Sequence, residues 1–187
     1  NLTIDHTKVS ASLTDFPIYV NPNDIIASIT SAQANSIRMY KADGTTEIPR
    51  EIVSTGEMHF KGDLSSTGDT IFIVDIDGVR SDYAMSDTYG GNNVWANGYE
   101  IVIHCDSTTL VDSSGNTTPT GYNLTTTSGI VGGALRFNGT SSHIDITGVT
   151  LSGTRQATVS QFRYNRDSGG LYQNYGSTPN YNSNNGF

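Results

Sequence analysis

The sequence predicts an all-β protein made of two consecutive β-sandwich modules of the jelly-roll kind. Three observations predict this fold class. Apolar and polar residues alternate with a period of two along most of the chain, as in strands with one buried face. Turn residues separate these runs at the short spacing typical of a sandwich. Charged residues make up only 15% of the chain, and the abundance of Thr, Ser, Asn and Gly indicates short strands and many turns.

The first module is expected over residues 1–80, with about six short strands. These strands are expected at residues 2–6, 16–20, 37–40, 47–53, 57–61 and 70–75. The stretch 70–75 is apolar at nearly every position, so we expect a central strand covered on both faces. A short helix is expected at Asp24–Ile29, capped by Asn23 or Asp24.

A connector and a second module are expected after the first. Residues 81–98 are rich in Gly, Asn and Asp and are expected to form the connector, with Trp95 packed at the junction. The second module is expected over residues 99–187, and it is expected to continue past Phe187 because no closing strand pattern precedes that residue. Its strands are expected at residues 100–105, 132–139, 143–146 and 157–164, with a mobile polar loop at 107–129.

Charge and cysteine content exclude several classes of function. The formal net charge is −8, and Lys8, Lys41 and Lys61 are the only lysines. Nucleic acids and anionic membranes require clustered basic residues, so neither is an expected partner. No apolar run approaches the ~20 residues that span a bilayer. Cys105 is the single cysteine, which excludes an intrachain disulfide, and its apolar surroundings favour a small buried hydrophobic residue.

Enzymatic function is not expected from the acidic residues. Glycoside hydrolysis needs two carboxylates roughly 5–10 Å apart. The few glutamates are Glu47, Glu51, Glu57 and Glu100. Four residues of strand would separate Glu47 from Glu51 by about 13 Å, which is too far. The Gly-x-Ser-x-Gly motif of serine hydrolases is also absent. We therefore expect no convergent set of reactive groups and no catalytic residues.

Three motifs raise the question of metal binding. Asp75-Ile76-Asp77-Gly78 is similar to the start of a calcium loop, but Ser86 stands where an EF-hand has Glu, so a strand end and turn are favoured. Asp112 and Asn116 offer oxygens on a loop, so calcium is a candidate cofactor there, although turn chemistry alone also explains them. No other cofactor is expected.

Two histidine–aspartate pairs form the last of these motifs. His104 and Asp106 share one strand face, as do His143 and Asp145. The two pairs would bind a transition metal if they met. Polar residues on a solvent-exposed face are the favoured alternative.

Tyrosines near the C-terminus are the candidate ligand-binding residues. Tyr164, Tyr172, Tyr175 and Tyr181 alternate with Asn, Gly and Ser. Rigid aromatic rings among small polar residues are typical of recognition loops. Coverage of a sandwich edge or a subunit contact is the equally weighted alternative.

Two ordered sets of motifs resemble known families. The first set is Ile4–Val9, Leu13–Val20, Ile37–Arg38, Asp43–Glu51 and Thr88–Trp95, and it resembles the bacterial family called domain of unknown function 2341. The second set is His104, Asp112–Asn116, Gly132–Thr140 and Ile144–Ile146, and it is similar to the concanavalin A-like, laminin-G-like lectin and glucanase superfamily. The second resemblance implies a jelly-roll sandwich often used to bind glycans. The first implies no catalytic residues.

These observations predict a non-enzymatic structural or adhesion protein located extracellularly, on a cell surface or on a virion. Its lectin-like module would recognise a glycan or a protein partner, and a homo-oligomer or larger assembly is compatible with this. One alternative is a structural component of a virion or filament, such as a capsid-decorating or tail-fibre protein. The other is the non-catalytic N-terminal part of a secreted glycoside hydrolase.

Overall fold

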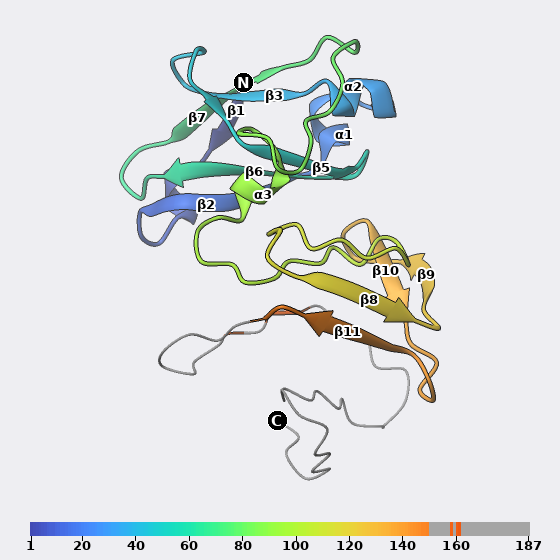
Figure 1. Ribbon diagram of the computed structural model, residues 1–187. Helices are drawn as coiled ribbons and strands as arrows, with labels where there is room; N and C mark the ends of the chain where they lie inside the picture. Colours follow the sequence, from blue (N-terminus) through green and yellow to red (C-terminus); the bar gives the residue numbers. More distant parts are fainter. Residues whose placement is uncertain (150–157, 159, 162–187) are drawn as a thin grey trace. The chain divides into compact units, whose positions relative to one another are not determined.

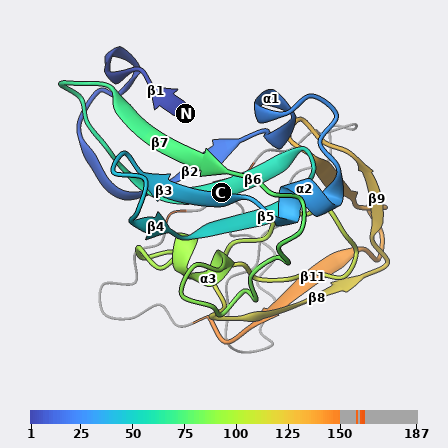
Figure 2. The ribbon, with the colours of Figure 1, turned by 90° about the horizontal axis from the view of Figure 1, so that it is seen from above.

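Two antiparallel sheets, both built from the first 75 residues, share one apolar core (Figure 1). The computed structural model describes residues 1–149, 158, 160 and 161. The four-stranded sheet has the order β1 (Leu2–Ile4), β7 (Thr70–Asp75), β3 (Arg38–Lys41) and β4 (Glu47–Ile48). The three-stranded sheet has the order β2 (Leu13–Val20), β6 (Glu57–Leu64) and β5 (Arg50–Ser54). Seen from above, the strands of the two sheets overlie one another (Figure 2).

The core lies between these sheets because alternate residues of each strand point inward. Met58 and Phe60 of β6 are completely buried, and Phe60 meets Phe72 of β7 edge to face with ring centroids 4.9 Å apart. Burial of a side chain of this size contributes about 1.5–3 kcal/mol. Gly62 leaves room for the Phe72 ring, since a Cβ at Gly62 would lie 2.6 Å from Phe72 Cζ.

The helices of the described residues are short, and three of the four begin at a side-chain cap. A 3-10 turn, η1 (His6–Lys8), follows β1. The helix α1 (Pro22–Ile25) begins earlier than expected, because Asn21 caps it. Pro22 occupies the first turn, where the backbone N–H that proline lacks would have no partner within the helix. The helix α2 (Ser31–Asn35) was not predicted, although its Thr30-x-x-Gln33 capping box is visible in the sequence. The helix α3 (Gly91–Val94) lies in the expected connector. None of the helices in the described part of the chain has the length and apolarity to cross a bilayer.

Two two-stranded ribbons follow in residues 118–147. One pairs β8 (Thr118–Tyr122) with β11 (His143–Thr147), and the other pairs β9 (Thr125–Ser128) with β10 (Gly133–Arg136). Strands β8 and β9 lie inside the stretch predicted as a polar loop, so that prediction is wrong there. Threonine suits a strand because its branched side chain fits a pleated surface, and this explains the error.

The expected strand at residues 100–105 is absent. Val102 N donates to Asp112 Oδ1, and Val102 O accepts from Ser113 N. The backbone of Val102 is therefore hydrogen-bonded to the turn at residues 112–115 and not to a neighbouring β-strand. Cys105 has a φ of 61°, in the left-handed region, which ends the extended backbone. Cys105 is half-buried, and burial raises the pKa of its thiol.

The all-β prediction is confirmed, because antiparallel strands dominate the described residues. Strand β7 is central, between β1 and β3, but its predicted coverage on both faces is wrong: Phe72 is buried while Ile71 is 40% exposed. Residues 1–149 belong to one compact unit. The jelly-roll topology and the module limits at residues 80 and 99 stay predictions. The strand expected at 157–164 falls almost entirely outside the described residues.

Candidate functional site

The face of the three-stranded sheet that points away from the core carries ionisable side chains. Strand pairing places Glu51 of β5 opposite His59 of β6, and Tyr19 of β2 opposite the same histidine. Glu57 precedes His59 by two residues, so both side chains lie on this face. The alternation that buries Met58 in the core therefore gathers two glutamates and a histidine on the other side.

Residues from the segment 95–113 cover this face. Trp95 and Ser113 are buried, and the side chain of His104 is only 10% exposed. The rings of His59 and His104 lie 4.9 Å apart between centroids, and Trp95 lies 5.1 Å from His59. We call Glu51, Glu57, His59 and His104 the carboxylate–histidine cluster.

His104 bridges the two glutamates. Its Nε2 lies 3.0 Å from Glu51 Oε2 and its Nδ1 lies 2.9 Å from Glu57 Oε1. An ionised carboxylate only accepts hydrogen bonds, so both ring nitrogens donate and the imidazole is positively charged. Burial lowers the pKa of His104, but the hydrogen bonds and charges of the two glutamates outweigh burial and raise the pKa to about 9.

Both glutamates are held ionised by the same contacts. Burial raises the pKa of Glu57, but hydrogen bonds from His104 and His59 dominate and lower it to about 2. The His59 contact joins Nε2 to Glu57 Oε1 at 3.0 Å. Burial also raises the pKa of Glu51, and the contacts with His104, together with hydrogen bonds from Ser113 and Trp95, lower it overall.

Glu51 is fixed by donors on both oxygens. Trp95 Nε1 donates to Oε2 at 2.7 Å, and Ser113 Oγ donates to Oε1 at 2.5 Å. The Ser113 hydroxyl therefore points to a carboxylate and not to an imidazole base. This geometry differs from that of a serine nucleophile, which donates to histidine.

The cluster overturns two expectations. We expected no convergent set of reactive side chains, and this set of four is one. We also favoured a solvent-exposed position for His104, whereas it is largely buried between two carboxylates. The absence of catalytic residues stays a prediction. The sequence did contain a signal for part of this cluster. The expected strands 47–53 and 57–61 form a hairpin, and its polar face carries Glu51, Glu57 and His59.

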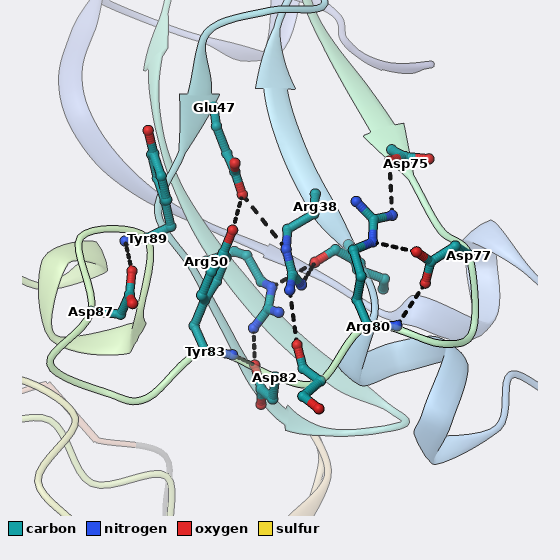
Figure 3. Close-up of polar contacts among 12 residues, drawn as sticks. Arg38, Glu47, Arg50, Asp75, Asp77, Arg80, Asp82, Tyr83, Asp87 and Tyr89 are labelled. Atoms are coloured by element: carbon teal, nitrogen blue, oxygen red, sulfur yellow. Dashed lines mark hydrogen bonds and ion pairs between the residues drawn. The ribbon is translucent and has the colours of Figure 1, made fainter.

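A second buried polar cluster surrounds two arginines (Figure 3). Arg50 donates from Nε to Ile37 O at 2.8 Å and from Nη2 to Asn35 O at 3.0 Å, and its Nη1 pairs with Asp82. Arg38 donates to the same two carbonyls. Carbonyls at the end of a helix lack partners within it, so the arginines satisfy Asn35 at the end of α2 and Ile37 just beyond its C-cap. The pair with Asp82 and a bond from Arg38 Nη2 to Ser81 O also hold residues 81 and 82 against the sheets, which is a structural role.

The calcium candidates lie in one tight turn. Asp112 accepts hydrogen bonds from the backbone N–H groups of Val102, Ser114 and Thr117 and from the hydroxyls of the last two. Burial raises the pKa of Asp112, and these hydrogen bonds lower it overall. Asn116 Nδ2 donates to Tyr99 O at 3.0 Å. Both side chains thus organise the turn, and calcium binding there stays a prediction.

The other candidate residues are dispersed. Asp75 and Asp77 both pair with Arg80, at 2.8 and 2.7 Å, at the expected strand end and turn. His143 is exposed on β11 and stacks on Tyr122, so it lies outside the cluster that contains His104. The candidate ligand-binding tyrosines, Tyr164, Tyr172, Tyr175 and Tyr181, lie outside the described residues.

Comparison of the chain with protein-family models, with curated proteins and with solved structures finds no match.

Proposed function

We propose that the chain is a non-enzymatic recognition module of an extracellular surface, whose second half binds glycans. The exposed face of the β8–β11 ribbon is the observation that supports glycan binding most directly. On this face Tyr122 stacks on its cross-strand partner His143, with ring centroids 4.5 Å apart and planes 14° apart. Asp145 stands opposite Thr120 on the same face.

This combination of groups matches the surface of a sugar. Aromatic rings provide flat apolar area, against which the C–H face of a sugar packs. The Asp145 carboxylate and the Thr120 hydroxyl provide hydrogen-bonding groups for sugar hydroxyls. All four residues are exposed, and fixed strand pairing holds the two rings in place.

The state of the buried acidic groups supports a non-enzymatic role. General acid–base catalysis needs a carboxyl group that reaches the substrate. Both oxygens of Glu51 and of Asp112 accept hydrogen bonds from fixed donors, and Glu57 Oε1 accepts from two histidines. These contacts fit a scaffold that holds its own segments together.

A glycan array tests the proposal directly. The wild-type chain is expected to bind a restricted set of glycans, and Tyr122→Ala is expected to lose at least tenfold in affinity, about 1.4 kcal/mol. Tyr19→Ala is the matched control, since Tyr19 is 44% exposed and Tyr122 is 43% exposed. Absence of glycan binding by the wild type, or equal binding by Tyr122→Ala, would contradict the proposal.

A structural component of a virion or filament is the second candidate. Ile130, at the turn of the β9–β10 ribbon, is 92% exposed, and Val131 and Phe137 beside that ribbon are also exposed. Exposed apolar side chains at one end of a ribbon would suit a contact with another subunit. Light scattering distinguishes the candidates: a stable oligomer that Ile130→Ser dissociates, together with a blank glycan array, would favour the assembly role.

A further inference from the structure

We propose that Glu57, His59 and His104 bind one zinc-like transition-metal ion, which ties the segment around His104 to strand β6. This inference is independent of glycan binding. It rests on the arrangement of ligand atoms, on a supporting layer of hydrogen bonds and on the donor chemistry.

The three ligand atoms already converge. Glu57 Oε1 lies 3.0 Å from His59 Nε2 and 2.9 Å from His104 Nδ1, and the candidate ligand atoms of the three residues all lie within 4.8 Å of one another. Zinc binds nitrogen and oxygen at about 2.0–2.2 Å in tetrahedral geometry, so its ligand atoms sit roughly 3.3 Å apart. Opening the two short contacts by a few tenths of an ångström makes room for the ion between them.

The hydrogen bonds around His104 match those of a metal-bound histidine. Such a histidine normally donates its second ring N–H to a carboxylate, which fixes the ring and its tautomer. With Nδ1 on the metal, His104 Nε2 donates to Glu51 Oε2. Trp95 and Ser113 in turn hold Glu51. These bonds fix the Glu51 carboxylate in the position from which it orients the His104 ring.

The donor set selects the class of metal. Two imidazole nitrogens and one carboxylate oxygen suit zinc and other first-row transition metals, whereas calcium and magnesium prefer oxygen alone. Three protein ligands leave one coordination position for water. All three side chains are largely buried, and the sequence distance between Glu57 and His104 makes the ion a cross-link between remote segments.

One other group of potential ligands occurs among the described residues, Asp5, His6 and Asp69. The two aspartates are exposed, His6 is half-buried, and its Nδ1 lies 2.7 Å from Asp69 Oδ1. No buried partner orients them, so we assign no site there. The group nevertheless provides a useful control.

Zinc alone, titrated into the metal-free chain of 187 residues, tests the proposal by calorimetry. The wild type is expected to bind one zinc ion with a Kd below about 1 µM, and excess calcium is not expected to compete for that site. His59→Gln and Glu57→Gln are each expected to weaken binding at least tenfold, and Glu51→Gln about 10–100-fold. The chain has four histidines. His143→Gln and His6→Gln are therefore matched controls, expected to bind like the wild type.

A spectroscopic measurement on the wild type removes the dependence on variants that fail to fold. Zinc is expected to shift the imidazole NMR signals of His59 and His104 and to leave those of His6 and His143 in place. Three outcomes would overturn the proposal: absence of zinc binding, full binding by a folded His59→Gln variant, or loss of binding in His6→Gln.

Discussion

Raising the pH is expected to destabilise the metal-free protein well before any thiol or phenol ionises. The pKa of His104 rises from an ordinary 6.5 to about 9 in the folded chain. The folded protein therefore keeps a proton that the unfolded chain releases above pH 6.5. The stabilisation is fully present below pH 6.5 and is lost as the pH passes through about 9.

The magnitude follows from this shift. One pKa unit corresponds to about 1.4 kcal/mol, so the free energy of unfolding should fall by roughly 3 kcal/mol across this range. The side chain of His104 is largely buried, so solvent screens the interaction only weakly. A typical domain has only about 5–15 kcal/mol of stability in total, which makes the effect easy to measure.

The assay is urea unfolding in EDTA, followed by the fluorescence of the only tryptophan, Trp95, which is hydrogen-bonded to Glu51. The pKa of Cys105 is raised from 9.0 and that of Tyr19 from 10.0, chiefly by burial, so both act only above pH 9. The variant His104→Gln should show little slope between pH 6.5 and 9. A flat profile for the wild type, or the same slope in His104→Gln, would refute the bridging imidazolium.

Three further predictions concern packing and buried charge, each measured as the change in the free energy of urea unfolding. Phe60→Ala should cost about 3–5 kcal/mol, whereas Ile71→Ala, at an exposed position of the other sheet, should cost under about 1 kcal/mol; similar costs would argue against the shared core. Gly62→Ala should cost about 1–3 kcal/mol because its Cβ meets the Phe72 ring, and a neutral effect would show that the ring moves freely. Arg50→Met should cost about 1–3 kcal/mol because it leaves the Asp82 carboxylate without its arginine partner and removes one of the two donors to the Asn35 and Ile37 carbonyls, and a loss under about 1 kcal/mol would contradict the role assigned to this arginine.

Local signals were enough to predict most of the strands in the first 75 residues. Period-two alternation placed strands β2, β3, β5 and β6 close to their observed positions, and the short apolar run at residues 70–75 placed β7. The Asp43-Gly44 turn was equally readable, and Gly44 has the left-handed φ of 67° that such a turn requires. Errors occurred where long-range contacts override local pattern. The apolar run at 100–105 bonds to the Asp112 turn, and the threonine-rich run at 118–128 pairs with strands that come later.

The carboxylate–histidine cluster was harder to predict for a related reason. Its sheet half is local, because Glu51, Glu57 and His59 belong to one hairpin. Its other half comes from His104, which is separated from Glu57 by 47 residues and lies in a segment without regular structure. No periodicity links these positions, so only the folded chain reveals that a face expected to meet solvent is covered.

The buried face of the three-stranded sheet also has a consequence for how the chain leaves the ribosome. Until residues 104–113 have been synthesised, Glu51 and Glu57 lack the partners that later enclose them. During synthesis the hairpin then presents a charged, hydrated face to solvent. Charged side chains on an uncovered sheet disfavour its pairing with neighbouring chains. The same carboxylates that later anchor the covering segment would therefore first act as a safeguard against aggregation.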